Sequence, residues 1–99
     1  MIKKAYLKSK NLCKVTFALP AADGTETIEI LGDFNSWSVG EGHKMKKQKN
    51  KTFKTVLNLE VGKEFEFRYL INGTTWINDN DADKQVSNPY GSENSVIST

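Results

Sequence analysis

The chain has 99 residues and a mass of 11.1 kDa, the size of one domain, so residues 1–99 are treated as a single unit. Hydrophobic residues make up 37% of the chain and charged residues 26%, which suits a folded globular domain and not a disordered tail. The net charge of +2 argues against a dedicated nucleic-acid binder, and the absence of any run of about 18 apolar residues argues against a membrane-spanning helix.

Short stretches in which apolar and polar residues alternate divide the first half of the chain into predicted strands. These strands cover residues 14–19, 27–32 and 44–46. Pro20 and the Asp23-Gly24 pair separate the first two, because proline ends a sheet strand and Asp-Gly favours a tight turn. Residues 33–42 are expected to form a polar loop. The pattern leaves open whether the lysine-rich residues 3–14 add an edge strand.

The second half of the chain holds the strongest strand signal. Predicted strands cover residues 53–59, 64–71, 74–77 and 95–98, with a polar loop over 78–93. In the longest run, the aromatic residues Phe65, Phe67 and Tyr69 share one face, and Arg68 points to the other. Asn72-Gly73 predicts a type I′ hairpin, since that turn needs positive φ at both positions.

Taken together, these elements predict an all-β fold. About seven short strands at intervals of roughly 8–12 residues, without a convincing amphipathic helix, are typical of an immunoglobulin-like antiparallel β-sandwich. Periodicity alone leaves a small β-barrel as the alternative.

Few residues are suited to bond chemistry. His43 is the only histidine and has no nucleophile near it in the sequence, so it is interpreted as a surface residue. Cys13 is the only cysteine, which excludes an internal disulfide and favours a small apolar role. Glycoside hydrolysis needs two carboxyl groups about 5–10 Å apart in a rigid cleft, and nothing in the sequence places two acids that way. No catalytic residue or cofactor is predicted.

A calcium site is also not predicted. Asp79, Asp81 and Asp83 have the first spacings of a calcium-binding loop. However, Lys84 stands where that loop needs glycine, and Tyr90 where it needs a bidentate glutamate. These acids are interpreted as a solvated loop, and no metal site is expected.

A basic run precedes the strand at 53–59. It consists of Lys44, Lys46, Lys47, Lys49 and Lys51. Solubility and protection of an exposed strand edge explain such lysines, and non-specific phosphate binding is the alternative. The N-terminal residues lack the apolar stretch of a signal peptide, so a cytoplasmic location is expected.

The two tryptophans lie outside the apolar stripes of the predicted strands. Trp37 is in a polar loop and Trp76 follows the Asn72-Gly73 turn. An exposed indole is a natural platform for the apolar face of a glucose ring. The alternative is that one or both rings plug the open end of a thin sandwich.

Several segments together resemble one known family. Residues 30–37 read ILGDFNSW and resemble "lvGdFNnW", the signature of the glycogen-binding and isoamylase N-terminal domains, carbohydrate-binding module family 48. Further similar segments, in the order found in the family, are 57–62, 65–73, 76–79 and 88–97. The resemblance covers about residues 15–97. It implies an early-set immunoglobulin-like sandwich that binds α-1,4-glucan, such as glycogen, starch or maltooligosaccharide, on its outer face.

The resemblance also implies a set of site residues. Trp37 and Trp76 would stack on sugar, while Arg68, in place of the family's lysine, and Asn94 would hydrogen-bond to it. Tyr90 and Ser92 take the places of the family's leucine and threonine, so both are expected to belong to the site.

The resemblance leaves three hypotheses about function. The first is a non-catalytic glucan-binding module. The second is a protein-interaction module whose tryptophans dock a glucan-metabolising enzyme or a regulator. The third, a small enzyme acting on glucan, has no candidate catalytic residues to support it. Neither nucleic acid nor membrane is an expected partner.

Overall fold

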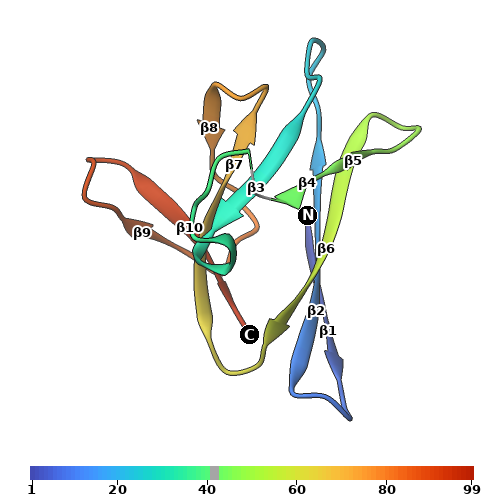
Figure 1. The fold of residues 1–99 in the computed structure, drawn as a ribbon, viewed down its shortest axis with the longest axis vertical. Coiled ribbons are helices and arrows are strands. Elements are labelled where there is room, and N and C mark those ends of the chain that lie inside the picture. Colours follow the sequence, from blue (N-terminus) through green and yellow to red (C-terminus); the bar gives the residue numbers. More distant parts are fainter. Residues whose placement is uncertain (41–42) are drawn as a thin grey trace.

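The computed structural model describes residues 1–40 and 43–99 as two antiparallel β-sheets (Figure 1). Sheet A contains, in spatial order, β1 (Ile2–Leu7), β2 (Leu12–Pro20), β6 (Thr52–Glu60) and β5 (Lys46–Lys47). Sheet B contains β4 (His43–Lys44), β3 (Ile28–Gly32), β7 (Glu64–Ile71), β10 (Glu93–Ser98) and β9 (Lys84–Ser87), with β8 (Thr75–Ile77) also paired to β7. The predicted all-β sandwich is confirmed.

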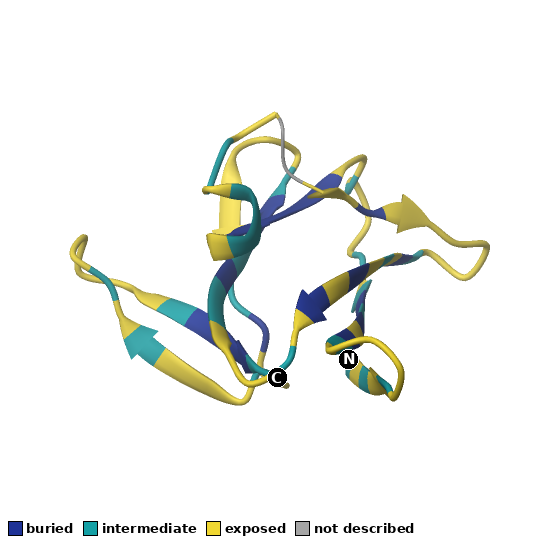
Figure 2. Cartoon of the chain, turned by 60° about the horizontal axis from the view of Figure 1, so that its bottom comes forward, coloured by how far each residue is buried: buried dark blue, intermediate teal, exposed yellow. Residues whose placement is uncertain are grey.

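The hydrophobic core lies between the two sheets, because alternate residues of the facing strands point inward. Figure 2 shows these buried residues at the centre and exposed residues in the projecting hairpins. The rings of Phe17 in sheet A and Phe67 in sheet B are both fully buried and meet edge to face, with centroids 5.3 Å apart. Cys13 is also fully buried in this core, which agrees with its expected apolar role.

Strand β7 organises the functional side of sheet B. It pairs with β3 on one side, while β10 and β8 share its other side. The register places Glu66 opposite Val96 and Leu70 opposite Trp76, so side chains from three strands meet on the outer face. The hairpin that leads into β8 has φ values of 51° at Asn72 and 72° at Gly73, and the predicted positive-φ turn is therefore confirmed.

Two sequence predictions about strands are wrong. The expected strand over residues 44–46 is divided, because the chain crosses from sheet B to sheet A at the buried residue Met45. The expected loop over 78–93 contains strand β9, whose residues are mostly exposed and polar. Pairing with β10 defines this edge strand, so apolar alternation could not reveal it. The open question about residues 3–14 is decided by β1, which pairs with β2 along its whole length.

The expected loop after β3 begins with the short 3₁₀ helix η1 (Asp33–Asn35), and its residues 41–42 lie outside the described residues. In the described ranges, no helix has the length and apolar character needed to cross a membrane.

Candidate functional site

A groove with a volume of about 670 Å³ lies on the outer face of sheet B. It runs between the loop after β3, the β7–β8 hairpin and the β9–β10 hairpin, which projects from the sheet in Figure 1. Its lining residues are Asp33, Trp37, Glu66, Arg68, Trp76, Asn88, Pro89, Tyr90 and Asn94. Five of the six residues expected from the sequence therefore line one groove, and Ser92 is the one that does not.

The indole of Trp37 is held in place by backbone and side-chain contacts. Ser36 and Trp37 have φ values of 56° and 58°, in the left-handed region that non-glycine residues seldom adopt. The amide of Trp37 donates to the Gly32 carbonyl at 3.1 Å, and its Nε1 donates to Asp33 Oδ1 at 3.0 Å. Such a conformation persists only where its surroundings require it, so these contacts fix a half-buried ring at the rim of the groove.

The GDFN segment supplies that fixed frame. The Asn35 side chain accepts the Gly32 amide at 3.0 Å and donates to the Ile30 carbonyl at 2.9 Å, which closes the turn. The second oxygen of Asp33 accepts the backbone amide of Glu66 at 2.8 Å. One carboxylate thus joins the Trp37 loop to β7. A Cβ at Gly32 would lie 2.3 Å from the Glu66 carbonyl oxygen, so only glycine permits this approach.

Trp76 and Arg68 form the opposite side of the groove. Trp76 is 37% exposed, and the Arg68 guanidinium carbon lies 5.6 Å from the centroid of its ring. This distance is that of a cation–π contact. Within the described part of the chain, the buried Nε of Arg68 has no hydrogen-bond partner. The groove therefore presents an aromatic ring beside a guanidinium group.

A row of amides and a carboxylate forms the floor between these walls. The Asn94 side chain donates to Glu66 Oε1 at 3.1 Å, and its oxygen accepts a hydrogen bond from Asn88 Nδ2 at 3.1 Å. Asn94 and Glu66 keep spare donor or acceptor capacity, because a primary amide has two N–H groups, a carbonyl oxygen has two lone pairs and a carboxylate has a second oxygen. The floor is thus pre-organised and still able to bind hydroxyl groups.

Asn88 also shapes the β9–β10 hairpin. Its side-chain oxygen accepts the backbone amides of Tyr90 at 2.9 Å and Ser92 at 3.2 Å. Its Nδ2 also donates to the Ser92 hydroxyl at 2.8 Å. Ser92 is therefore occupied in bracing the hairpin, while the side chain of Tyr90, 91% exposed, stands free at the groove.

Sequence reasoning missed four lining residues. They are Asp33, Glu66, Asn88 and Pro89. Asp33 and Asn88 lie within motifs that carried the family resemblance, and that position was the available signal. Glu66 and Pro89 also lie within such segments, 65–73 and 88–97, and Glu66 has outward parity in β7 as well.

The acids considered for calcium binding have other partners. Tyr69 donates its hydroxyl to Asp79 Oδ2 at 2.6 Å in a buried pair, and the other Asp79 oxygen accepts the Asp81 amide at 2.8 Å. Burial, reinforced by this carboxylate, raises the pKa of Tyr69 above its ordinary value, so the phenol stays protonated and donates. The Asp79 amide in turn donates to Ser95 Oγ at 3.0 Å. The network ties the chain that follows β8 to β10.

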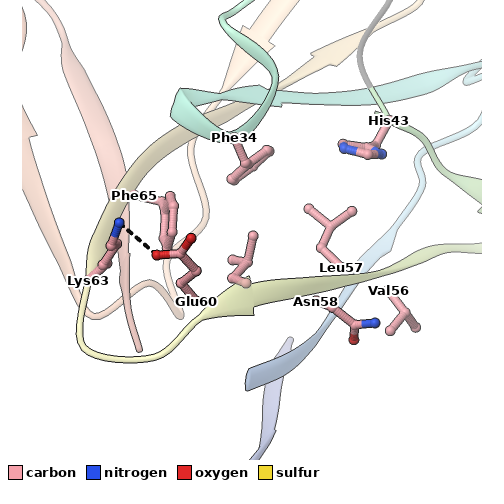
Figure 3. A pocket seen from close by; sticks show the side chains of 9 residues that line it. Phe34, His43, Val56, Leu57, Asn58, Glu60, Lys63 and Phe65 are labelled. Carbon is pink, nitrogen blue, oxygen red and sulfur yellow. Dashed lines mark ion pairs between the residues drawn. The ribbon is translucent and has the colours of Figure 1, made fainter. Parts of the chain in front are cut away.

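A second hollow, of about 480 Å³, opens between the edges of the two sheets. Figure 3 shows Phe34 and Phe65 on one side and Leu57 on the other, with the Lys63–Glu60 ion pair at the rim, where N and O are 2.7 Å apart. The exposed His43 also lines it. None of the residues in the expected site lies here.

An open groove with aromatic walls and a polar floor, carried on a small β-sandwich, is typical of small ligand-binding modules. The chain belongs to the family of the glycogen recognition site of AMP-activated protein kinase, which matches residues 13–99. This match confirms the resemblance to carbohydrate-binding module family 48, extends over almost the whole chain and implies a module that binds glucan. Comparison with curated proteins gives no match.

Proposed function

We propose that the outer-face groove binds α-1,4-glucan, as glycogen, starch or maltooligosaccharide, by stacking sugar rings on Trp37 and Trp76. The observation that carries the proposal is that both indoles line one groove together with Arg68, Asn94 and Tyr90. The aromatic faces suit the apolar C–H surface of glucose, and the planar polar groups suit its hydroxyls.

The expected affinity is modest. Each stacked ring would remove roughly 100 Å² from water, or about 2–3 kcal/mol at ~25 cal/mol/Å². Ordering a flexible oligosaccharide and desolvating its hydroxyls offset much of that gain, so micromolar to millimolar dissociation constants are expected. Chains of several glucose units should bind better than glucose, because one ring cannot cover both tryptophans.

Tyr90 would extend the platform. Its ring is almost fully exposed, yet its backbone is fixed by Asn88, so stacking on it costs little backbone ordering. Arg68 would donate from a planar fork, in a geometry different from that of a lysine point charge.

Calorimetry with maltoheptaose, glycogen and glucose tests this function. Maltoheptaose and glycogen should bind and glucose should bind far more weakly. Trp37→Ala should abolish measurable binding while circular dichroism shows an intact fold. Tyr6→Ala is the matched control, because Tyr6 is 54% exposed on β1 in the other sheet. The absence of heat at millimolar maltoheptaose would refute the function, and normal binding by Trp37→Ala would refute the site.

The second candidate is docking of a glucan-metabolising enzyme or regulator on the same aromatic residues. The exposure of Trp76 and Tyr90 favours it, because exposed aromatics commonly anchor protein interfaces. It predicts a partner whose capture is lost in Tyr90→Ala and unaffected by maltoheptaose. Clear glucan binding without any such partner would count against it.

A further inference from the structure

Charge is divided unequally between the two sheets. The segments that build sheet A, residues 1–20 and 46–60, each contain five lysines, so they hold ten of the 14 basic residues of the chain. The same segments contain only one of the 12 acidic residues, Glu60. The net charge of +2 therefore conceals a basic sheet opposite an acidic one.

The strand register shows which lysines point outward. Cys13 and Val15 face the core, so Lys14 between them faces solvent, and the same parity applies across the sheet. Register pairs place Lys3 and Val56 on either side of Thr16, and Lys46 directly opposite Lys54. The basic face is defined here as Lys3, Lys14, Lys46 and Lys54, all of which are exposed.

Within residues 1–40 and 43–99, these lysines form no ion pair. The one acid on this side of sheet A, Glu60, is paired with Lys63 at 2.7 Å. Like charges directly opposite each other, as in Lys46 and Lys54, destabilise a sheet. An external anion would relieve this repulsion.

The character of the face favours a protein as the source of that anion. Val56, 43% exposed, lies among the lysines together with Thr16 and Ala5. An apolar centre with a polar rim is typical of protein interfaces. The outward positions of sheet A in the described strands include no arginine for bidentate phosphate binding and no aromatic ring for base stacking.

We propose that the basic face docks the carboxylate-rich surface of a partner protein. The face belongs to sheet A and the aromatic groove to the outer side of sheet B, so both can be occupied at once. The inference stands on the lysines alone and does not depend on glucan binding.

Poly-L-glutamate is the probe for this face, measured by calorimetry over a series of salt concentrations. Lys14→Glu/Lys54→Glu should weaken its binding about tenfold or more, because like charges then face the probe. Lys10→Glu/Lys49→Glu is the matched control: it changes the net charge equally, but both residues lie in turns. This control variant should weaken binding of poly-L-glutamate no more than about threefold, because it changes only the long-range electrostatic field of the protein. Titration of the same variants with maltoheptaose measures binding at the groove, so the result for the basic face can be told apart from the result for the groove.

Lys14→Gln/Lys54→Gln replaces the charge-reversed variant if that variant does not fold. A smaller loss of affinity for poly-L-glutamate is then expected. Three results would overturn the proposal. They are no binding of poly-L-glutamate at low salt, equal weakening in the face and turn variants, and tighter binding to duplex DNA or phosphatidylserine vesicles than to poly-L-glutamate.

Discussion

The guanidinium of Arg68 lies over the indole of Trp76, 5.6 Å from the ring centroid, on adjacent strands of sheet B. One face of the ring is thereby occupied by a cation, and the orientation of the ring is restrained. Arg68 can thus act on a ligand in two ways, by donating to it and by positioning Trp76.

Substitution of Arg68 separates these roles. Arg68→Ala should weaken maltoheptaose binding about tenfold, since a partly desolvated cation–π contact and a donor, together worth about 1–2 kcal/mol, are both lost. Arg68→Lys keeps the charge and should recover part of the affinity. Calorimetry measures both. Equal affinity of all three proteins would show that Arg68 contributes neither contact.

Gly32→Ala should destabilise the fold. The new Cβ would lie 2.3 Å from the Glu66 carbonyl oxygen and 2.9 Å from Phe67 Cβ, so strands β3 and β7 would have to separate. A cost of about 2–4 kcal/mol in urea unfolding is expected for overpacking against backbone. Gly24→Ala is the control: its φ is +88° with no atom near the new Cβ, so only backbone strain of about 1 kcal/mol is expected. Equal losses of stability in Gly32→Ala and Gly24→Ala would contradict the steric explanation.

Asn88→Ala should impair binding more than stability. The variant loses the acceptor that holds the Tyr90 and Ser92 amides and the donor to Asn94, so the hairpin at the groove loosens. Maltoheptaose binding is expected to weaken about tenfold, as binding must then order the loop. Asn80→Ala, at an exposed position of a neighbouring loop, is the control and should bind like the unmodified protein. Unchanged binding in Asn88→Ala would show that pre-organisation of the hairpin is unimportant.

Protonation of the Asp83 carboxylate should contribute to the loss of stability of the protein in acid. Burial acts to raise its pKa, but hydrogen bonds from Lys4 and the Ser98 amide outweigh it, and the pKa of the carboxyl is lowered. A lowered folded-state pKa stabilises the protein above the unfolded value of about 3.9, and this stability is lost as the pH falls through the folded value.

The Asp83 contribution can be measured by urea unfolding between pH 6 and pH 2. Asp83→Asn should cost no more than about 1 kcal/mol at pH 6, because the ion pair is partly exposed, and should flatten the acid side of the stability profile. Asp23→Asn, at a fully exposed carboxylate, should leave the profile unchanged. A profile that Asp83→Asn does not alter would disprove the assignment.

Local pattern was sufficient for the central strands. Residues 53–59 and 64–71 alternate strictly enough to identify β6 and β7, and Asn72-Gly73 marks the hairpin by its backbone preference. Local pattern failed at Met45, where one residue buried between the sheets divides a predicted strand in two. It failed again at β9, where hydrogen bonds to β10 create a strand without apolar alternation.

The sequence by itself determined the fold class and, through its resemblance to family 48, five residues that line the groove, because both depend on local alternation and short motifs. Only the tertiary structure decided how they meet. Asp33 reaches Glu66 across 33 residues of chain, and Asn94 reaches Glu66 across 28. The opposition of Lys46 and Lys54 likewise follows from strand pairing. Register between distant strands is set by the packing of the whole core, so no local pattern contains it.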